Sequence, residues 1–153
     1  GHTVIVVDGI PCNCGRNGCW ESYASATALI AQTKAKMKEC PDSKMWELCG
    51  GDIDKVSGRT AFNAMYAGDK AGKEVVDRYR YYVAVGIINI INIFQPEVLC
   101  VGGGISNEGD NLLDPIREYV EKERYSKYAK KQTKICKAVL GNDAGIIGAA
   151  LLG

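Results

Sequence analysis

Apolar and polar positions along the chain recur mainly at helical spacing, and helix-ending residues divide the pattern into segments. Serine side chains accept N–H hydrogen bonds at helix starts, whereas proline cannot continue a helix. The longest segment follows a break and cap at Gly68-Asp69 and ends before Pro96. The predicted helices run from Ser22 or Ser25 to about Glu39, from about Gly58 to Ala67, from about Lys70 to Phe94, from Asp110 or Asn111 to about Tyr125, and from Ala144 to Leu152, with a weakly helical or irregular segment from Met45 to Val56.

Short runs of β-branched and apolar residues predict strands between these helices. Thr3 to Val7 is one such run, and Lys134 to Leu140 is another. Val98 to Val101 is apolar throughout, which is typical of a buried strand and would put Cys100 in its core. Alternating strands and helices indicate an α/β domain in which helices cover a sheet. A chain of 153 residues is long enough for one such domain with a real core.

One histidine and three cysteines near the start of the chain have the spacing of a metal site. His2, Cys12, Cys14 and Cys19 form the pattern H-x9-C-x-C-G-x-x-G-C-x-E, which ends at Glu21. Thiolate and imidazole ligands in this number suit a closed, tetrahedral structural zinc site. The two glycines of the pattern allow the tight turn that such a site needs.

Two other interpretations of these cysteines stay open on spacing alone. They could be ordinary buried thiols, or they could form disulfides, although no signal peptide is visible. His2 could be a solvated terminal residue rather than a ligand. Seven cysteines, an odd number, without a visible signal peptide suggest a reducing cytoplasm. The cysteines without ligand spacing are interpreted as small hydrophobic residues: Cys40, Cys49, Cys100 and Cys136.

The Gly-His pair followed by CNCGRNGCWE resembles the zinc motif of the ROK family of sugar kinases and repressors. Further landmarks follow in the order found in that family. They are Ala67-Gly68-Asp69, Gln95-Pro96-Glu97, Val101-Gly102-Gly103-Gly104-Ile105-Ser106, and Asp143-Ala144-Gly145-Ile146-Ile147-Gly148-Ala149-Ala150. The resemblance therefore covers the whole chain.

The resemblance implies an actin-like, ribonuclease H-like ATPase fold with an inserted zinc loop over residues 2–21. The family's phosphate-binding hairpin and its Asn-Asp pair, whose aspartate is the catalytic base, have no counterpart in the sequence. Residues 1–153 are accordingly expected to be the C-terminal domain of a sugar kinase, inactive alone, whose N-terminal half is absent from this chain. That half is then an expected partner, and the family often forms homo-oligomers.

The activity implied by the resemblance is phosphorylation of a hexose by ATP with magnesium. Glucose is the first choice of substrate, because the zinc motif looks most like that of the bacterial members acting on glucose. Kinases for fructose, N-acetylmannosamine or N-acetylglucosamine are alternatives, as is a sugar-responsive transcriptional repressor. A zinc-stabilised interaction domain is a further, plainer interpretation.

The resemblance gives Glu21 and His2 a role in sugar binding. A carboxylate accepts two hydrogen bonds from paired hydroxyls, and the zinc histidine would contact the sugar through its remaining ring edge. Glu21 could instead be a solvated residue at a helix start, and His2 a purely structural ligand. Trp20 could pack on a sugar face or in the core, and Arg16 is interpreted as loop surface.

Gly102, Gly103 and Gly104 follow directly on a predicted strand, where ligands bind in open α/β sheets. Glycines let a backbone approach a ligand closely, but a plain tight turn explains the run equally well. The resemblance favours contact with the nucleotide, with Ile105 and Ser106 as weaker candidates.

The overall charge identifies no further partner. The net charge is +1 with 24% charged residues, and the basic stretches Lys34 to Lys38 and Lys127 to Lys137 are interpreted as solvated faces. Nucleic acid is therefore not expected as a partner. The apolar run from Val83 to Phe94 is shorter than the roughly 20 residues that cross a bilayer, so a membrane is not expected either.

Overall fold

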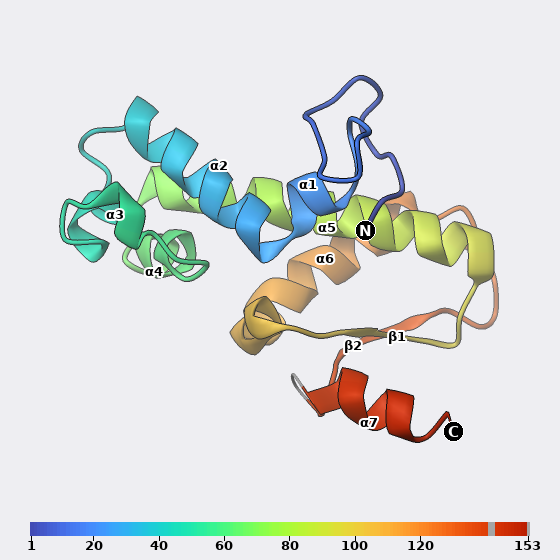
Figure 1. Ribbon diagram of the computed structural model, residues 1–153. Helices are drawn as coiled ribbons and strands as arrows, with labels where there is room; N and C mark the ends of the chain where they lie inside the picture. The colour runs from blue at the N-terminus through green and yellow to red at the C-terminus, as the bar shows by residue number, and fades with distance from the viewer. Residues whose placement is uncertain (141–142, 153) are drawn as a thin grey trace. The chain divides into compact units, whose positions relative to one another are not determined.

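The computed structural model describes residues 1–140 and 143–152 (Figure 1). The chain forms two compact units. The first unit is Gly1–Gly86 and the second is Ile87–Gly153. The long helix α5 (Lys70–Phe94) begins in the first unit and ends in the second.

The first unit joins an irregular N-terminal loop to a group of helices. Its elements are α1 (Glu21–Ala24), α2 (Ala26–Glu39), α3 (Lys44–Leu48), the 3-10 turn η1 (Ile53–Lys55), α4 (Thr60–Tyr66) and most of α5. The Ser25 hydroxyl accepts a hydrogen bond from Ala28 N at 3.1 Å, which confirms Ser25 rather than Ser22 as the cap of α2. Asp69 caps α5, because its carboxylate accepts from Gly72 N at 2.6 Å.

Helices α2 and α5 lie side by side in the first unit (Figure 1). Lys36 of α2 pairs with Glu74 of α5 at 2.7 Å, and the Tyr79 hydroxyl of α5 donates to Ala24 O at 3.1 Å. Large apolar side chains fill the core of this unit: Leu29, Met37, Met45, Phe62 and Val76 are fully buried. Burial of such side chains contributes about 1.5–3 kcal/mol each, so this core is the main source of stability.

Trp20 connects the N-terminal loop to α5 through a hydrogen bond and a packing contact. Its indole Nε1 donates to Tyr82 O at 2.8 Å. A Cβ added at Gly86 would lie 1.9 Å from Trp20 Cε2, so the indole lies directly against the backbone of the helix. Of the two roles open to Trp20 in the sequence, packing against the helical core is the one its contacts support.

The strand predicted for Thr3 to Val7 is wrong. This segment forms one isolated bridge, Val4 to Cys19, and then bends, because Ile5 N and Val6 N both donate to Gly18 O. Its β-branched residues favour extended backbone, but a strand needs a ladder of partners, and residues 3–7 form only the bridge at Val4. Val7 is accordingly 83% exposed.

The second unit contains a parallel pair of strands connected through a helix. Its elements after α5 are β1 (Val98–Val101), the 3-10 turn η2 (Gly104–Glu108), α6 (Asp110–Glu123), β2 (Lys134–Lys137) and α7 (Ala144–Ala150). The two strands pair in register from Val98 with Lys134 to Val101 with Lys137. Parallel strands require a crossover, which α6 supplies. The predicted α/β alternation is thus confirmed, although β2 ends before Leu140.

The side chain of Arg117 ties α6 to β2. Its Nε and Nη2 donate to Ile135 O at 3.1 and 3.0 Å, and its Nη1 pairs with Asp110 and Asp114. Five apolar side chains of α6 and β2 are buried: Leu112, Leu113, Ile116, Val120 and Ile135.

Two details of the second unit correct the sequence prediction. The N-cap of α6 is Gly109, at φ 62°, and neither Asp110 nor Asn111 caps the helix. The strand β1 is not buried in this chain: Val98 and Cys100 are exposed, and Leu99 and Val101 are half-buried. Within the described residues β1 pairs only with β2. Successive side chains of a strand point to opposite faces, and those of Val98 and Cys100 point to the exposed face.

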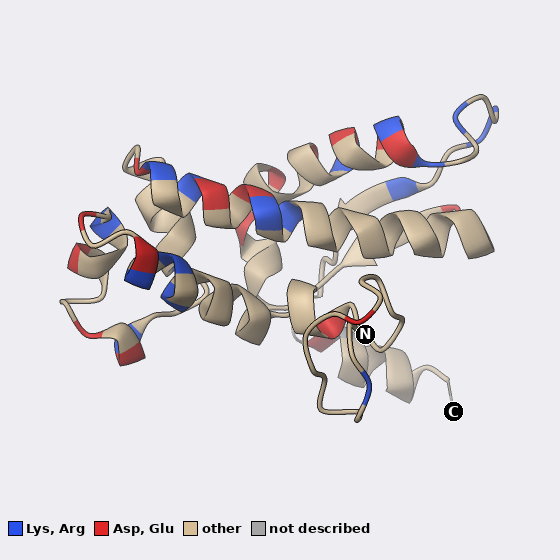
Figure 2. Ribbon diagram, turned by 90° about the horizontal axis from the view of Figure 1, so that it is seen from above, with Lys and Arg blue, Asp and Glu red and all other residues tan. Residues whose placement is uncertain are grey.

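Basic and acidic residues lie together on α5 and α6, whereas α4 and α7 have neither (Figure 2). Among the described residues, no helix is long and apolar enough to cross a membrane. The apolar end of α5 belongs to a helix that also contains Lys70, Glu74 and Asp77.

We expect Gly86→Ala to destabilise the protein by about 1–3 kcal/mol, the usual cost of overpacking, because the new methyl group would meet the Trp20 ring. Urea denaturation measures the loss. A double-mutant cycle with Trp20→Phe is the control, since a smaller ring should reduce the penalty. An equal penalty in both backgrounds would contradict the contact.

Candidate metal centre and glycine turn

The N-terminal loop folds back on itself through backbone hydrogen bonds. Cys12 N donates to Arg16 O and Gly18 N donates to Ile10 O, each at 2.8 Å. Gly18 has φ 76°, and a Cβ there would lie 1.7 Å from Val6 O. Only glycine fits this close crossing, which brings the far side of the loop back beside its start.

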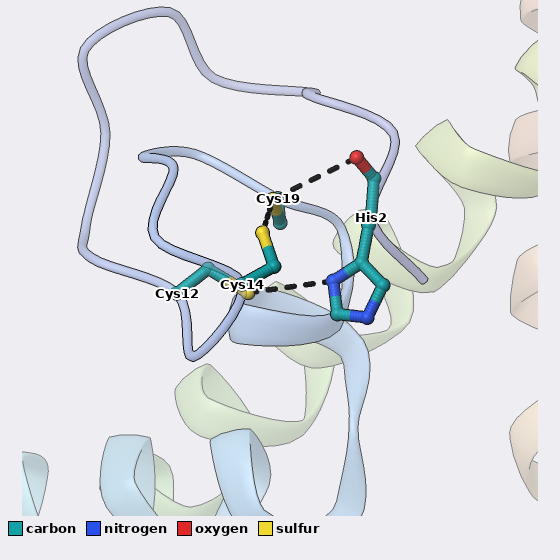
Figure 3. A group of neighbouring side chains, drawn as sticks. All are labelled: His2, Cys12, Cys14 and Cys19. Carbon is teal, nitrogen blue, oxygen red and sulfur yellow. Dashed lines mark hydrogen bonds between the residues drawn. The ribbon is translucent and has the colours of Figure 1, made fainter.

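This crossing gathers His2, Cys12, Cys14 and Cys19 into one cluster (Figure 3). One ligand atom from each lies within 4.8 Å of every other, with Cys14 Sγ to Cys19 Sγ at 3.5 Å and Cys12 Sγ to His2 Nδ1 at 3.5 Å. Zinc bound to thiolates at about 2.3 Å separates its ligands by about 3.8 Å in a tetrahedron. The donor set and its spacing therefore fit a zinc ion with four protein ligands.

The thiols of the cluster differ in their electrostatic surroundings. The pKa of Cys12 is lowered to about 6, mainly by a backbone hydrogen bond from Cys14 and then by the Ser22 hydroxyl. Burial raises the pKa of Cys19, and its hydrogen bonds with Cys14 and Cys12 add to the rise. Several thiolates this close together repel one another unless a cation lies between them. A metal ion would supply that positive charge.

Arg16 is an exposed residue of the loop, as expected, but it also contacts the cysteine cluster. Its guanidinium donates to His2 O and makes hydrogen bonds with Cys19 and Cys14, which raise the pKa of Arg16. A cation beside thiolates offsets part of their charge. The signal in the sequence was the position of Arg16 between Cys14 and Cys19, which does not by itself reveal whether the guanidinium contacts the thiols.

The side chains of Glu21 and His2 lie close to each other. His2 Nδ1 faces Cys12, whereas its Nε2 lies 3.7 Å from Glu21 Oε2. The side chains of both are about half exposed, at 53% and 46%. Glu21 N donates to Gly1 O at 2.7 Å, so the backbone also joins the two segments. The Nδ1 atom of His2 thus faces the cysteine cluster, and the Nε2 atom is left on the side of Glu21.

The glycine run belongs to the second unit and forms an open turn. Gly103 has φ 84°, and a Cβ added at Gly103 or Gly104 would meet nothing within 4 Å. The Ser106 hydroxyl is buried and donates to Gly103 O at 2.7 Å, so Ser106 stabilises the turn itself. The open backbone leaves room for a ligand close to Gly103 and Gly104.

The chain belongs to the ROK family, whose family model matches residues 1–153. A glucokinase of Halalkalibacterium halodurans is 38% identical over 157 residues, which cover 99% of this chain and 46% of that protein. A xylose repressor of Bacillus subtilis is 26% identical over 148 residues, 97% of this chain and 34% of the repressor. The chain spans about half the length, or less, of these curated relatives.

The crystal structure of a ROK family glucokinase from Streptomyces griseus in complex with glucose and AMPPNP matches the whole chain. The TM-score is 0.88 at 32% identity, and the match covers 100% of this chain and 50% of that one. The chain therefore has the actin-like ATPase fold of the ROK sugar kinases, as the sequence predicted.

We expect Gly18→Ala to disrupt the metal cluster, because its methyl group would collide with Val6 O. The matched control is Gly15→Ala, which has a similar φ of 84° but no atom within 4 Å of the added Cβ. The control should lose only the roughly 1–2 kcal/mol of left-handed strain and should retain the ability to bind zinc at the cluster. Zinc content and thermal unfolding distinguish the two variants, and equal metal loss in both would contradict the close crossing.

Proposed function

We propose that residues 1–153 are the C-terminal domain of an ATP-dependent glucokinase, which converts glucose to glucose 6-phosphate in a longer protein. The observation that best supports this is the TM-score of 0.88 to the glucokinase solved with glucose and AMPPNP. Identity of 38% to a curated glucokinase, over nearly the whole chain, supports the same activity.

The first part of the proposal is a structural zinc ion held by His2, Cys12, Cys14 and Cys19. The support is the spacing of their ligand atoms, all within 4.8 Å of one another. Zinc with four protein ligands keeps no open position, so its role is to hold the loop that contains His2 and leads into Glu21. Arg16 would stabilise the negative charge of the thiolates from outside.

The second part is a sugar site at Glu21 and His2. A carboxylate accepts hydrogen bonds from two neighbouring hydroxyls, which is the feature that a hexose offers. His2 Nε2, turned away from Cys12 and toward Glu21, would bind a further hydroxyl. Because both residues adjoin the metal loop, their separation would be fixed before the sugar binds, which reduces the entropic cost of binding.

The third part is a nucleotide site that includes Gly102, Gly103 and Gly104. Open backbone at Gly103 and Gly104 supports a close approach by ATP. Magnesium bound with the nucleotide would neutralise charge on the phosphoryl group. The aspartate that accepts the hydroxyl proton is proposed to lie in the N-terminal half, which acts as the partner of this domain.

A sugar-responsive repressor is the second candidate, and the 26% identity to the xylose repressor of Bacillus subtilis favours it. The repressor would use the same sugar site without phosphoryl transfer. A DNA-binding domain in the longer protein would support the repressor, whereas a catalytic Asn-Asp pair would support the kinase.

We expect the full-length, zinc-loaded protein to release ADP when it is given ATP, magnesium and glucose. A coupled assay with a panel of hexoses measures the relative kcat/KM of each sugar. Fastest turnover with another hexose would correct the substrate. No turnover with any sugar, in a folded sample that binds glucose, would favour the repressor.

We expect Glu21→Gln to raise the KM for glucose about 10- to 100-fold, because hydrogen bonds to a charged group are worth roughly 1.5–3 kcal/mol. The KM for ATP should change little. Glu47→Gln removes the same charge from α3, outside the metal loop, and is the control. An unchanged KM for glucose in Glu21→Gln would exclude Glu21 from the sugar site.

A further inference from the structure

Two cysteines outside the metal cluster face each other across the parallel strands. Cys100 of β1 and Cys136 of β2 are paired residues of the ladder. Paired residues direct their side chains to the same face of a sheet. Their sulfur atoms lie 3.4 Å apart and share a hydrogen bond.

This pair differs from the remaining cysteines of the chain. The other contacts between cysteine sulfurs join Cys12, Cys14 and Cys19, which belong to the N-terminal cluster. Cys100 is exposed and Cys136 is half-buried, so a small reagent can reach the pair in this chain. The pKa of Cys100 is raised, first by its hydrogen bond with Cys136 and then by burial.

The ladder also satisfies the backbone requirement of a disulfide. Neighbouring strands lie about 4.7–4.9 Å apart, and disulfide-linked residues have Cα atoms about 4.4–6.8 Å apart. The sulfur atoms need to approach only from 3.4 Å to about 2.05 Å. Side-chain rotation can achieve this without separating the strands.

We propose that Cys100 and Cys136 form a reversible disulfide that clips β1 to β2 when a low-molecular-weight disulfide is in excess. The Cys100 thiolate attacks the small disulfide, forms a mixed disulfide and releases one small thiol. The Cys136 thiolate then attacks Cys100 Sγ and releases the second small thiol. Two protein thiols are oxidised, one small disulfide is reduced to two thiols, and the two protein protons end on those thiols.

The location of the clip gives it a structural consequence. Cys100 lies two positions before Gly102, where β1 opens into the glycine turn, so the disulfide would fix the end of the strand that leads into the turn. The formation of the bond depends only on the β1–β2 pairing. It therefore does not rest on the proposed kinase activity or on the zinc ion.

The test is peptide mapping of the full-length native protein after incubation with oxidised glutathione and alkylation of the remaining thiols. Trypsin cuts after Arg80, Arg117, Lys134 and Lys137, which places the two cysteines in peptides 81–117 and 135–137. Each of these peptides contains a single cysteine, so one linked species reports the bond. We expect this species to account for most of Cys100 and to disappear after treatment with dithiothreitol.

Three variants make the result specific. Cys100→Ser and Cys136→Ser should each abolish the linked species, and Cys136→Ser should leave Cys100 as a mixed disulfide with glutathione. Cys40→Ser is the matched control and should keep the cross-link. If the native protein instead retains free or singly glutathionylated Cys100, or links Cys100 to another cysteine, the proposal is overturned.

Discussion

The contact between Trp20 and α5 is the interaction on which the arrangement of the candidate site depends. Its indole lies against the backbone at Gly86 and hydrogen-bonds to Tyr82 O. Trp20 stands between Cys19, a member of the metal cluster, and Glu21, the proposed sugar ligand. A single anchored residue therefore positions the two neighbouring groups against the most regular element of the first unit.

The N-terminal loop of residues 2–19, which contains the histidine and the three cysteines, has little regular secondary structure. It therefore depends on contacts other than the Trp20 anchor for its conformation. Its backbone forms two isolated bridges and a few turn hydrogen bonds, and Gly18 crosses Val6 at a distance that no larger residue permits. A loop of this kind buries little apolar surface. Metal coordination is a common means of stabilising such a segment, because the free energy of binding adds directly to that of folding.

Charge at the site is balanced by neighbours rather than by solvent alone. Thiols 3.5 Å apart resist joint ionisation, while Arg16 interacts with Cys14 and Cys19 from the side of the loop. His2 faces the thiols with Nδ1 and the Glu21 carboxylate with Nε2. In the proposed site, His2 would thus connect the structural zinc to the sugar-binding carboxylate, with one ring nitrogen for each role.

Local signals in the sequence predicted the elements whose ends are fixed by nearby residues. Ser25 and Asp69 act as caps, and the long helix ends at Phe94 shortly before Pro96. The same reasoning failed for Thr3 to Val7 and for the cap of α6. In the first case the residues favoured a strand that had no partner for a ladder, and in the second Gly109 occupied the cap position in a conformation that sequence did not reveal.

The sequence by itself determined the metal-type donor set, the neighbouring Glu21 and the family, because these follow from residue types at short and fixed spacings. Tertiary structure decided the features that depend on residues distant in the chain. Arg16 turned toward the thiols, Trp20 packed on Gly86, and Cys100 came opposite Cys136 across 36 positions of sequence. These contacts arise from loop closure, helix packing and strand register, which local patterns constrain only weakly.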